Sequence, residues 1–369
     1  MGKIISFHYY KSFIYIEILI LSKILFDNFL ESKFKKIYSE TSLELLITNI
    51  GKSLAYFLFL IEKKYLTYKK KFINQRTFMM EKIEETKNEN PKKHSYILFI
   101  IFFLTLLDFT NYNLYVSNIL DAQNIKIAIN GLGLISYGIF LIINEHYYLN
   151  IELYKHHCLG LILCFISIFL YFFYILFVLY QKHFVFHIIL FLIISCELGF
   201  LFSIQSIIEK KLNFDYYISI YYICFIEGIF GLFLIGIYFI ILTFLFNDNT
   251  IFIFFNNINN IIQFIIITIL YSIINLIFYI CRLKIFENNR PSYYIIASLL
   301  SQLIKNIFNS KYIIFTMYFI SLLGCLIFCE IITLDFCGLD KYTFEKTSDR
   351  GFQESLLLKK STSYDKFED

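Results

Sequence analysis

Continuous apolar runs recur along almost the whole chain of 369 residues and are separated by short polar or basic stretches. A run of about 20 apolar residues is long enough for an α-helix to cross a ~30 Å hydrocarbon core. A transmembrane β-barrel would show alternating apolar and polar positions instead. The pattern therefore predicts an all-α integral membrane protein with ten transmembrane helices, at residues 12–30, 41–61, 95–115, 119–143, 158–180, 187–208, 216–246, 258–281, 293–308 and 312–332.

The composition is typical of a single polytopic membrane domain spanning residues 1–369. Hydrophobic residues make up 58% of the chain and charged residues only 17%, which is outside the range of soluble domains. The spans form a first half at 12–180 and a second half at 187–332, with a basic loop at 62–94 and a tail at 333–369. The net charge of +4 follows from the loops, so membrane lipid is an expected partner and nucleic acid is not. A homodimer is left open.

The basic residues predict which side of the membrane each loop faces. Most of the 33 Lys and Arg residues fall in alternate loops, among them 62–94, the tail, and the segments that hold Lys210, Arg282 and Arg290. Basic residues accumulate in cytosolic loops. Both chain termini, the basic loop and the tail are therefore expected in the cytosol.

A carboxylate interrupts the apolar run at 216–246. Glu227 lies about 16 Å along a helix from Tyr216, which is about half of the ~30 Å hydrocarbon core. A charge at that depth costs roughly 2.5 to 3.5 kcal/mol, so it faces a bundle interior or a water-filled cavity more often than lipid. The alternative is a side chain near a helix end that reaches back to water.

Further polar groups within the predicted spans favour a translocation pathway when they are taken as a set. For any one of them, an interhelical hydrogen bond explains the residue equally well. The pathway candidates are Glu227, Glu197, Lys23, Lys52, Asp108, Asn111, Gln123, Lys126, Asn130 and Gln205. Small residues let helices approach closely, and the glycines expected in this role are Gly131, Gly138, Gly228 and Gly231.

Several kinds of chemistry lack support in the sequence. There is no Cys-x-x-Cys pair, phosphate-binding glycine loop, nucleophile elbow or His-Glu-x-x-His motif, so no metal site, no cofactor and no enzyme activity is expected,. A membrane-embedded lipid enzyme remains an alternative, and it would need a polar cluster at one interface. The nearest candidates, expected in solvated loops, are His146, His156 and His157 with Glu145 and Glu152.

Two sequence stretches resemble a known family. The letters QSIIEKKL at 205–212, followed by EGIFG at 227–231, are similar to the junction of the sixth and seventh helices in the drug/metabolite transporter superfamily. Within that superfamily they resemble the F type of solute carrier family 35. A second match is the series from Asp108 through Tyr115 to Gly131 and Gly138, and a third, weaker match is Lys23 with the DNF at 27–29. Two positions depart from that branch, namely Asn130, often basic there, and Lys52, often acidic there.

The resemblance implies ten helices in two five-helix halves of inverted topology, with alternating access to a central site. It implies a transporter of a small polar organic solute, working by exchange or with protons in an endomembrane such as that of the lysosome, vacuole or Golgi. Nucleotide sugars, amino acids or peptides, and cationic metabolites are all open as substrates. Lysines at 23, 52 and 126 can attract anionic groups, while Glu197 and Glu227 can carry protons. A non-transporting scaffold stays as a further alternative.

Overall fold

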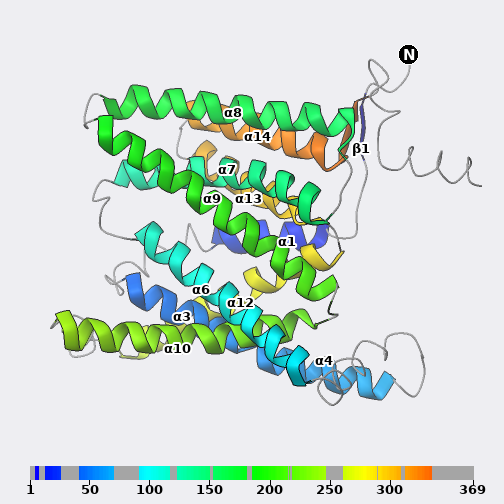
Figure 1. The fold of residues 1–369 in the computed structure, drawn as a ribbon, viewed down its shortest axis with the longest axis vertical. Helices are drawn as coiled ribbons and strands as arrows, with labels where there is room; N and C mark the ends of the chain where they lie inside the picture. Colours follow the sequence, from blue (N-terminus) through cyan, green and yellow to red (C-terminus); the bar gives the residue numbers. More distant parts are fainter. Residues whose placement is uncertain are drawn as a thin grey trace, which may run out of the picture.

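The computed structural model describes residues 5–7, 13–25, 41–69, 91–116, 123–149, 153–180, 185–214, 216, 218–246, 261–288, 290–308 and 312–334, and nearly all of them lie in helices (Figure 1). The helices are α1 (Phe13–Leu25), α3 (Thr41–Ser53), α4 (Ala55–Lys69), α6 (Pro91–Val116), α7 (Gln123–Leu149), α8 (Lys155–Tyr180), α9 (Val185–Phe214), α10 (Ile220–Phe246), α12 (Ile261–Asn288), α13 (Ser292–Phe308) and α14 (Tyr312–Phe328). Two short strands, β1 (Ile5–Phe7) and β2 (Ile332–Leu334), complete the described elements.

The helical fold class predicted from the apolar runs is confirmed. Five helical segments are long and apolar enough to cross a membrane: Glu44–Leu66, His157–Tyr174, Leu192–Asn213, Ile220–Ile241 and Thr268–Glu287. Two shorter apolar helical segments are Ser95–Thr110 and Ile314–Phe328. The protein is thus suited to a multi-pass membrane position, while the count of ten spans stays a prediction.

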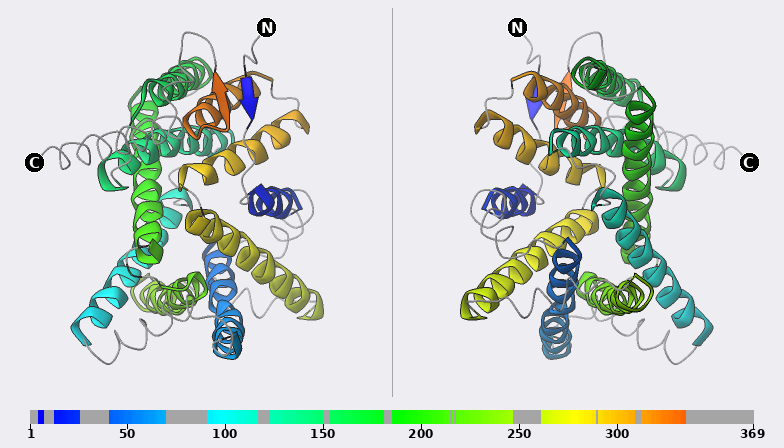
Figure 2. Two further views of the ribbon diagram at one scale, coloured as in Figure 1. Left: turned by 90° about the vertical axis from the view of Figure 1, so that its right-hand side faces the viewer. Right: turned by 90° about the vertical axis from the view of Figure 1, so that its left-hand side faces the viewer.

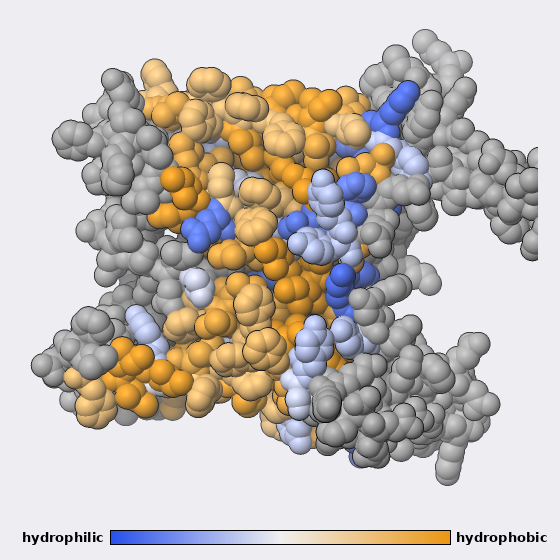
Figure 3. All heavy atoms as spheres, in the orientation of Figure 1, coloured by the Kyte–Doolittle hydropathy of each residue, from blue (hydrophilic) through white to orange (hydrophobic). Residues whose placement is uncertain are grey.

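The outer surface agrees with a lipid environment. Figure 3 shows one face covered mainly by hydrophobic residues, with the hydrophilic ones gathered mostly toward the side where β1 lies. Large apolar side chains such as Phe177 and Phe244 are more than three-quarters exposed, at 76% and 78%. Extensive apolar exposure of this kind is rare on soluble monomers.

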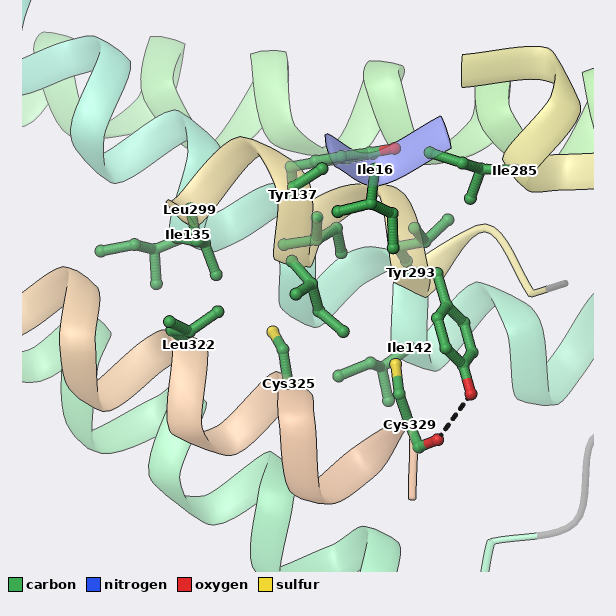
Figure 4. Packing of buried hydrophobic residues seen from close by; sticks show 14 of the residues in the cluster. Ile16, Ile135, Tyr137, Ile142, Ile285, Tyr293, Leu299, Leu322, Cys325 and Cys329 are labelled. Carbon is green, nitrogen blue, oxygen red and sulfur yellow. Dashed lines mark hydrogen bonds between the residues drawn. The ribbon is translucent and has the colours of Figure 1, made fainter. Parts of the chain in front are cut away.

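The helices form two groups that are joined by α1 and α12 (Figure 1) and by a contact of α9 with α6. In one group α7 packs along α9 and α8 packs along α14, with α13 beside α14. In the other, α10 packs against α3, α4 and α6. The largest buried hydrophobic cluster is centred on the first group and extends to α1, α10 and α12. Within it, Ile135 of α7 meets Leu299 of α13 and Leu322 of α14 (Figure 4).

The two ends of the described chain meet. Strands β1 and β2 pair antiparallel, with Ile5 opposite Leu334, and Figure 2 shows them side by side at one end of the helix bundle. The segment before the first helix and the segment after the last helix therefore lie on the same side of the bundle.

Glycines let several helix backbones touch. A Cβ added at Gly228 of α10 would lie 2.5 Å from the backbone nitrogen of Ser53 in α3, and one at Gly160 of α8 would lie 2.6 Å from the carbonyl oxygen of Gly324 in α14. Gly231 faces the Asn49 side chain, and Gly131 faces the hydroxyl groups of two tyrosines. By contrast, an added Cβ at Gly138 would make only ordinary contacts, 3.6 Å from Ile295.

Gly228→Ala is expected to destabilise the protein by about 1–3 kcal/mol, because a methyl group would push the α10 backbone away from α3. Gly236→Ala is the matched control on the same helix, since an added Cβ there meets nothing within 4 Å and alanine favours a helix. Apparent melting temperatures of the purified proteins in detergent would compare the two. Equal melting temperatures for Gly228→Ala and Gly236→Ala would show that the α3 and α10 backbones can separate at little cost in stability.

Candidate functional site

A buried lysine joins three helices. Lys52, at the end of α3, is completely buried, and its Nζ lies 2.6 Å from Asp108 Oδ2 of α6 and 3.4 Å from Glu227 Oε2 of α10. The close packing of Gly228 on Ser53 places the neighbouring Glu227 next to Lys52. A buried charge requires such partners, because removal from water is expensive for an unpaired ion.

An aromatic ring completes the surroundings of this ammonium group. The Tyr279 ring of α12 lies below Lys52, with 3.9 Å from Nζ to the ring centroid. The Tyr279 hydroxyl also donates a hydrogen bond to Asp108 Oδ2 at 3.4 Å. Cations are attracted to the negative face of an aromatic ring, so two carboxylates and one ring form a cage for an ammonium ion.

A second ion pair lies beside this cage. Arg282, one turn after Tyr279 on α12, donates from Nη2 to Glu209 Oε1 of α9 at 3.0 Å. Gln205, one turn before Glu209, donates to the same oxygen at 3.0 Å. The guanidinium group also lies over the rings of Phe286 and Tyr294, 5.4 and 5.5 Å from their centroids.

We call these five ionisable residues, drawn from five helices, the charged cluster: Lys52, Asp108, Glu209, Glu227 and Arg282. The two ion pairs of Lys52 and the ion pair of Arg282 are electrostatically connected, because the charges of Glu209 and Glu227 interact, as do those of Asp108 and Arg282. With every group ionised, carboxylates outnumber cations by one. The charged cluster therefore becomes neutral when it takes up one proton or one further cation.

Most of the buried atoms that lack a hydrogen bond in the charged cluster and at the adjoining Gln205 are acceptors. Among the residues that the structure describes, the buried atoms without a hydrogen bond here are Glu227 Oε1, Glu209 Oε2, Gln205 Oε1 and Arg282 Nε. Glu209 Oε2 lies 2.9 Å from Arg282 Nη2, but the hydrogen bond from that nitrogen is directed to Oε1. Buried polar atoms without partners are costly, and they mark a place where a ligand with N–H groups gains bonds.

The structure brings together four of the predicted pathway residues, namely Lys52, Asp108, Gln205 and Glu227. Glu197 is exposed on α9 and is not among them. The side chains of the remaining candidates lie outside the described part of the structure: Lys23, Asn111, Gln123, Lys126 and Asn130.

Three residues of this site were missed by the sequence patterns. Tyr279 was assigned to an ordinary apolar run, Glu209 to a helix junction, and Arg282 to a cytosolic loop. Helices α9 and α12 continue to Phe214 and Asn288, so Glu209 and Arg282 lie inside them and are buried at 2% and 5% exposure. The assignment of Arg282 to a loop was wrong because its charge is satisfied within the bundle.

Tyr279 and Arg282, three positions apart, share a helix face, and this spacing is the signal that a search for polar stripes would detect.

A second polar region lies at the end of the bundle near β2. Glu145 of α7 is completely buried and accepts a hydrogen bond from the backbone N–H of Ser292, at the start of α13, at 2.7 Å. His157, near the start of α8, is also completely buried. The expectation that both residues lie in solvated loops was wrong, because helices α7 and α8 include them and α13 and α14 cover them.

The hydrogen bonds of His157 determine its neutral tautomer. Its Nδ1 accepts from the backbone N–H of Tyr154 at 3.2 Å, so Nε2 carries the proton and donates it to Glu330 Oε1 at 2.9 Å,. Glu330 follows α14 with a φ of 58°, which few residues other than glycine adopt. Hydrogen bonds from the N–H groups of Glu330 and Ile331 to Ile327 and Leu326 end the helix there, as in a Schellman motif.

Protonation of Glu145, which lies beyond the predicted span at 119–143, is expected to make the stability of the folded protein depend on pH. Burial raises the pKa of the Glu145 carboxyl from 4.5 to about 7, against the opposing effect of Arg290. Between these values the folded protein holds a proton that the unfolded chain has lost. Stability therefore falls as pH rises through this window, by about 3 kcal/mol in all.

Melting temperatures in detergent from pH 4.5 to 8 would measure this effect against Glu145→Gln. Glutamine keeps the acceptor for Ser292 and does not titrate, so the variant is expected to show a smaller fall. Parallel curves for the two proteins would contradict the assignment to Glu145.

The fold and the charged cluster together define a helical protein suited to a membrane, with ionisable groups inside an apolar bundle. No family model matches the chain, and no curated protein matches it significantly. Within the described residues, no group of three or more His, Cys, Asp or Glu side chains is arranged to hold a metal ion.

Proposed function

We propose that the protein is a secondary transporter that carries a small polar organic solute across an internal membrane by alternating access. The observation that supports this best is the charged cluster, which collects side chains from α3, α6, α9, α10 and α12. Replacement of a buried ion pair by well-packed hydrophobic residues is often neutral or stabilising. Stability alone is thus a weak reason for this cluster, whereas ion and solute pathways regularly use such groups at membrane depth.

The architecture that we propose is ten transmembrane helices in two inverted halves, with α3 and α4 forming one span. Several helix contacts support it, because a helix of one half and its counterpart in the other half, five spans away in the chain, make corresponding contacts. The contact of α3 with α12 corresponds to that of α10 with α6, and the contact of α1 with α12 corresponds to that of α9 with α6. Likewise, the contact of α7 with α9 corresponds to that of α13 with α1. Inverted repeats of this kind are the usual basis of alternating access.

Both termini are proposed to lie in the cytosol. The pairing of β1 with β2 supports an even number of spans, and the basic loops support the cytosolic side. Epitope tags at the two ends are expected to be accessible to antibody once the plasma membrane alone is permeabilised. Protection of one tag only would contradict an even number of spans, and with it the two-halves architecture.

The excess carboxylate suggests how transport is coupled. One proton or one cationic group neutralises the charged cluster. A neutral cluster costs less free energy than a charged one to keep buried while the helices rearrange around it. Solute and proton can therefore take turns in the same site, which is the thermodynamic requirement for exchange between them.

Uptake by the purified protein in liposomes tests the proposal. A panel of amines, amino acids, peptides and nucleotide sugars would be screened for solute-driven proton movement with a pH-sensitive dye inside the vesicles. At least one class is expected to give flux that exceeds that of empty liposomes. A folded, correctly inserted protein that moves none of these classes would support a scaffold instead.

A further inference from the structure

We infer that the charged cluster binds an organic solute through a primary ammonium group, and that Lys52 occupies the ammonium position when the solute is absent. This inference rests on the proposed transport function for its role, but it concerns the chemistry of the site. The site is already a binding site for an alkylammonium ion, since Lys52 Nζ lies between Asp108 and Glu227 and over the Tyr279 ring.

The unsatisfied atoms define which ligand charge and which donors the site can accept. Glu227 Oε1 and Gln205 Oε1 are buried acceptors without hydrogen bonds within the described residues, and carboxylates are in excess. A cation with N–H groups satisfies both conditions. An anionic solute satisfies neither, and a quaternary ammonium ion brings charge without donors.

Lys52 is better suited to withdraw from the site than Arg282. Its ammonium group ends a flexible four-carbon chain and bonds as a compact point charge. Arg282 is held by Glu209 and lies over two aromatic rings. In addition, α3 ends beside Lys52, where the N–H of Leu54 is shared between the carbonyl oxygens of Ile50 and Gly51, both at 3.2 Å. This break between α3 and α4 is a point at which the backbone can bend.

Replacement of one ammonium group by another leaves the number of charges between Asp108 and Glu227 unchanged, while the displaced Lys52 stays in the charged cluster, so that the cluster as a whole gains one cation. The solute would take the place of Lys52 between Asp108 and Glu227, and Lys52 would return after release. The empty carrier would therefore never expose two unpaired carboxylates to the apolar bundle, which would be expensive.

Lys52→Ala tests the inference with propylammonium chloride as the probe, because propylammonium replaces the atoms that the substitution removes. The readout is the apparent melting temperature of the full-length protein in detergent as the probe concentration rises. Wild type is expected to show saturable stabilisation, and Lys52→Ala is expected to saturate at an at least about tenfold lower concentration because the tethered competitor is gone. Lys284→Ala, which removes a lysine paired with Glu287 outside the charged cluster, is expected to behave as wild type.

Three salts at equal ionic strength serve as chemical controls: sodium chloride, tetramethylammonium chloride and sodium propionate. Three outcomes would overturn the inference. Tetramethylammonium could stabilise the proteins as much as propylammonium does, or propionate could stabilise them. The third is that propylammonium raises the melting temperature of neither protein more than sodium chloride does. If Lys52→Ala does not fold, Lys52→Ala/Asp108→Asn keeps the net charge of the cluster and retains Glu227 and Tyr279, and the same outcomes apply to it.

Binding and transport can fail separately in this design. Saturable propylammonium binding without amine flux in liposomes would leave the ammonium site standing and overturn the transport function. Flux of another solute class without any propylammonium response would support the transport function and overturn the ammonium site.

Discussion

Glu227→Gln is expected to reduce solute flux in liposomes at least about 100-fold while leaving the protein folded. Glutamine has the shape of glutamate and is less costly to bury, and its oxygen can still accept a hydrogen bond from Lys52. It cannot take up a proton or balance a second cation. The charged cluster would then contain two cations and two carboxylates, so the excess carboxylate that we assign to proton or solute would be absent.

Measurement of uptake between pH 5 and 8 would separate the two roles of Glu227. Loss of turnover at every pH indicates a solute contact, and loss of only the pH dependence indicates a proton carrier. Glu197→Gln is the matched control, since Glu197 is a glutamate of the same bundle that is exposed on α9. Unchanged flux and unchanged pH dependence in Glu227→Gln would make Glu227 a structural residue.

Arg282→Met is expected to destabilise the protein by about 3–5 kcal/mol, because it leaves the Glu209 carboxylate buried without its cation. Glu209 is 2% exposed, and Arg282 is its ion-pair partner at 2.9 Å. Abundance in membranes and melting temperature in detergent should both fall sharply. Arg282→Met/Glu209→Gln removes both charges and is expected to recover most of the loss.

The matched comparison for this pair is Lys284→Met, which breaks the more exposed pair with Glu287 and should cost about 1 kcal/mol or less. A double variant as unstable as Arg282→Met alone would contradict the ion-pair explanation. In that case the contribution of Arg282 would lie in its packing against Phe286 and Tyr294.

The helices could be predicted well because the rule that produces them is local. In lipid each backbone N–H and C=O must be bonded within its own segment, so a long apolar run has few alternatives to a helix. Predicted spans at 158–180 and 293–308 correspond closely to α8 (Lys155–Tyr180) and α13 (Ser292–Phe308). The boundaries failed where a charge ends the apolar run but not the helix, as at Glu209 in α9 and Arg282 in α12.

The site was only partly predictable. Depth along a helix singled out Glu227, Lys52 and Asp108, because an isolated charge in an apolar run is visible in the sequence. It also singled out Glu197, which has the same local pattern and is exposed. Glycines follow both glutamates, at Gly228 and Gly199, so close helix packing is indicated near each. These letters do not show which glutamate is buried, because the face that each presents depends on how its helix is rotated against the others.

The sequence by itself determined that the chain is helical and apolar enough for a membrane, and that charges are placed inside its helices. Only the tertiary structure decided which charges meet, because Lys52, Asp108 and Glu227 belong to three separate helices. Their meeting depends on close approach of α3 and α10 at Gly228 and on the position of the Tyr279 ring. Helix-to-helix distances of this kind arise from the shapes of many contacting side chains at once, and no short segment of the chain contains that information.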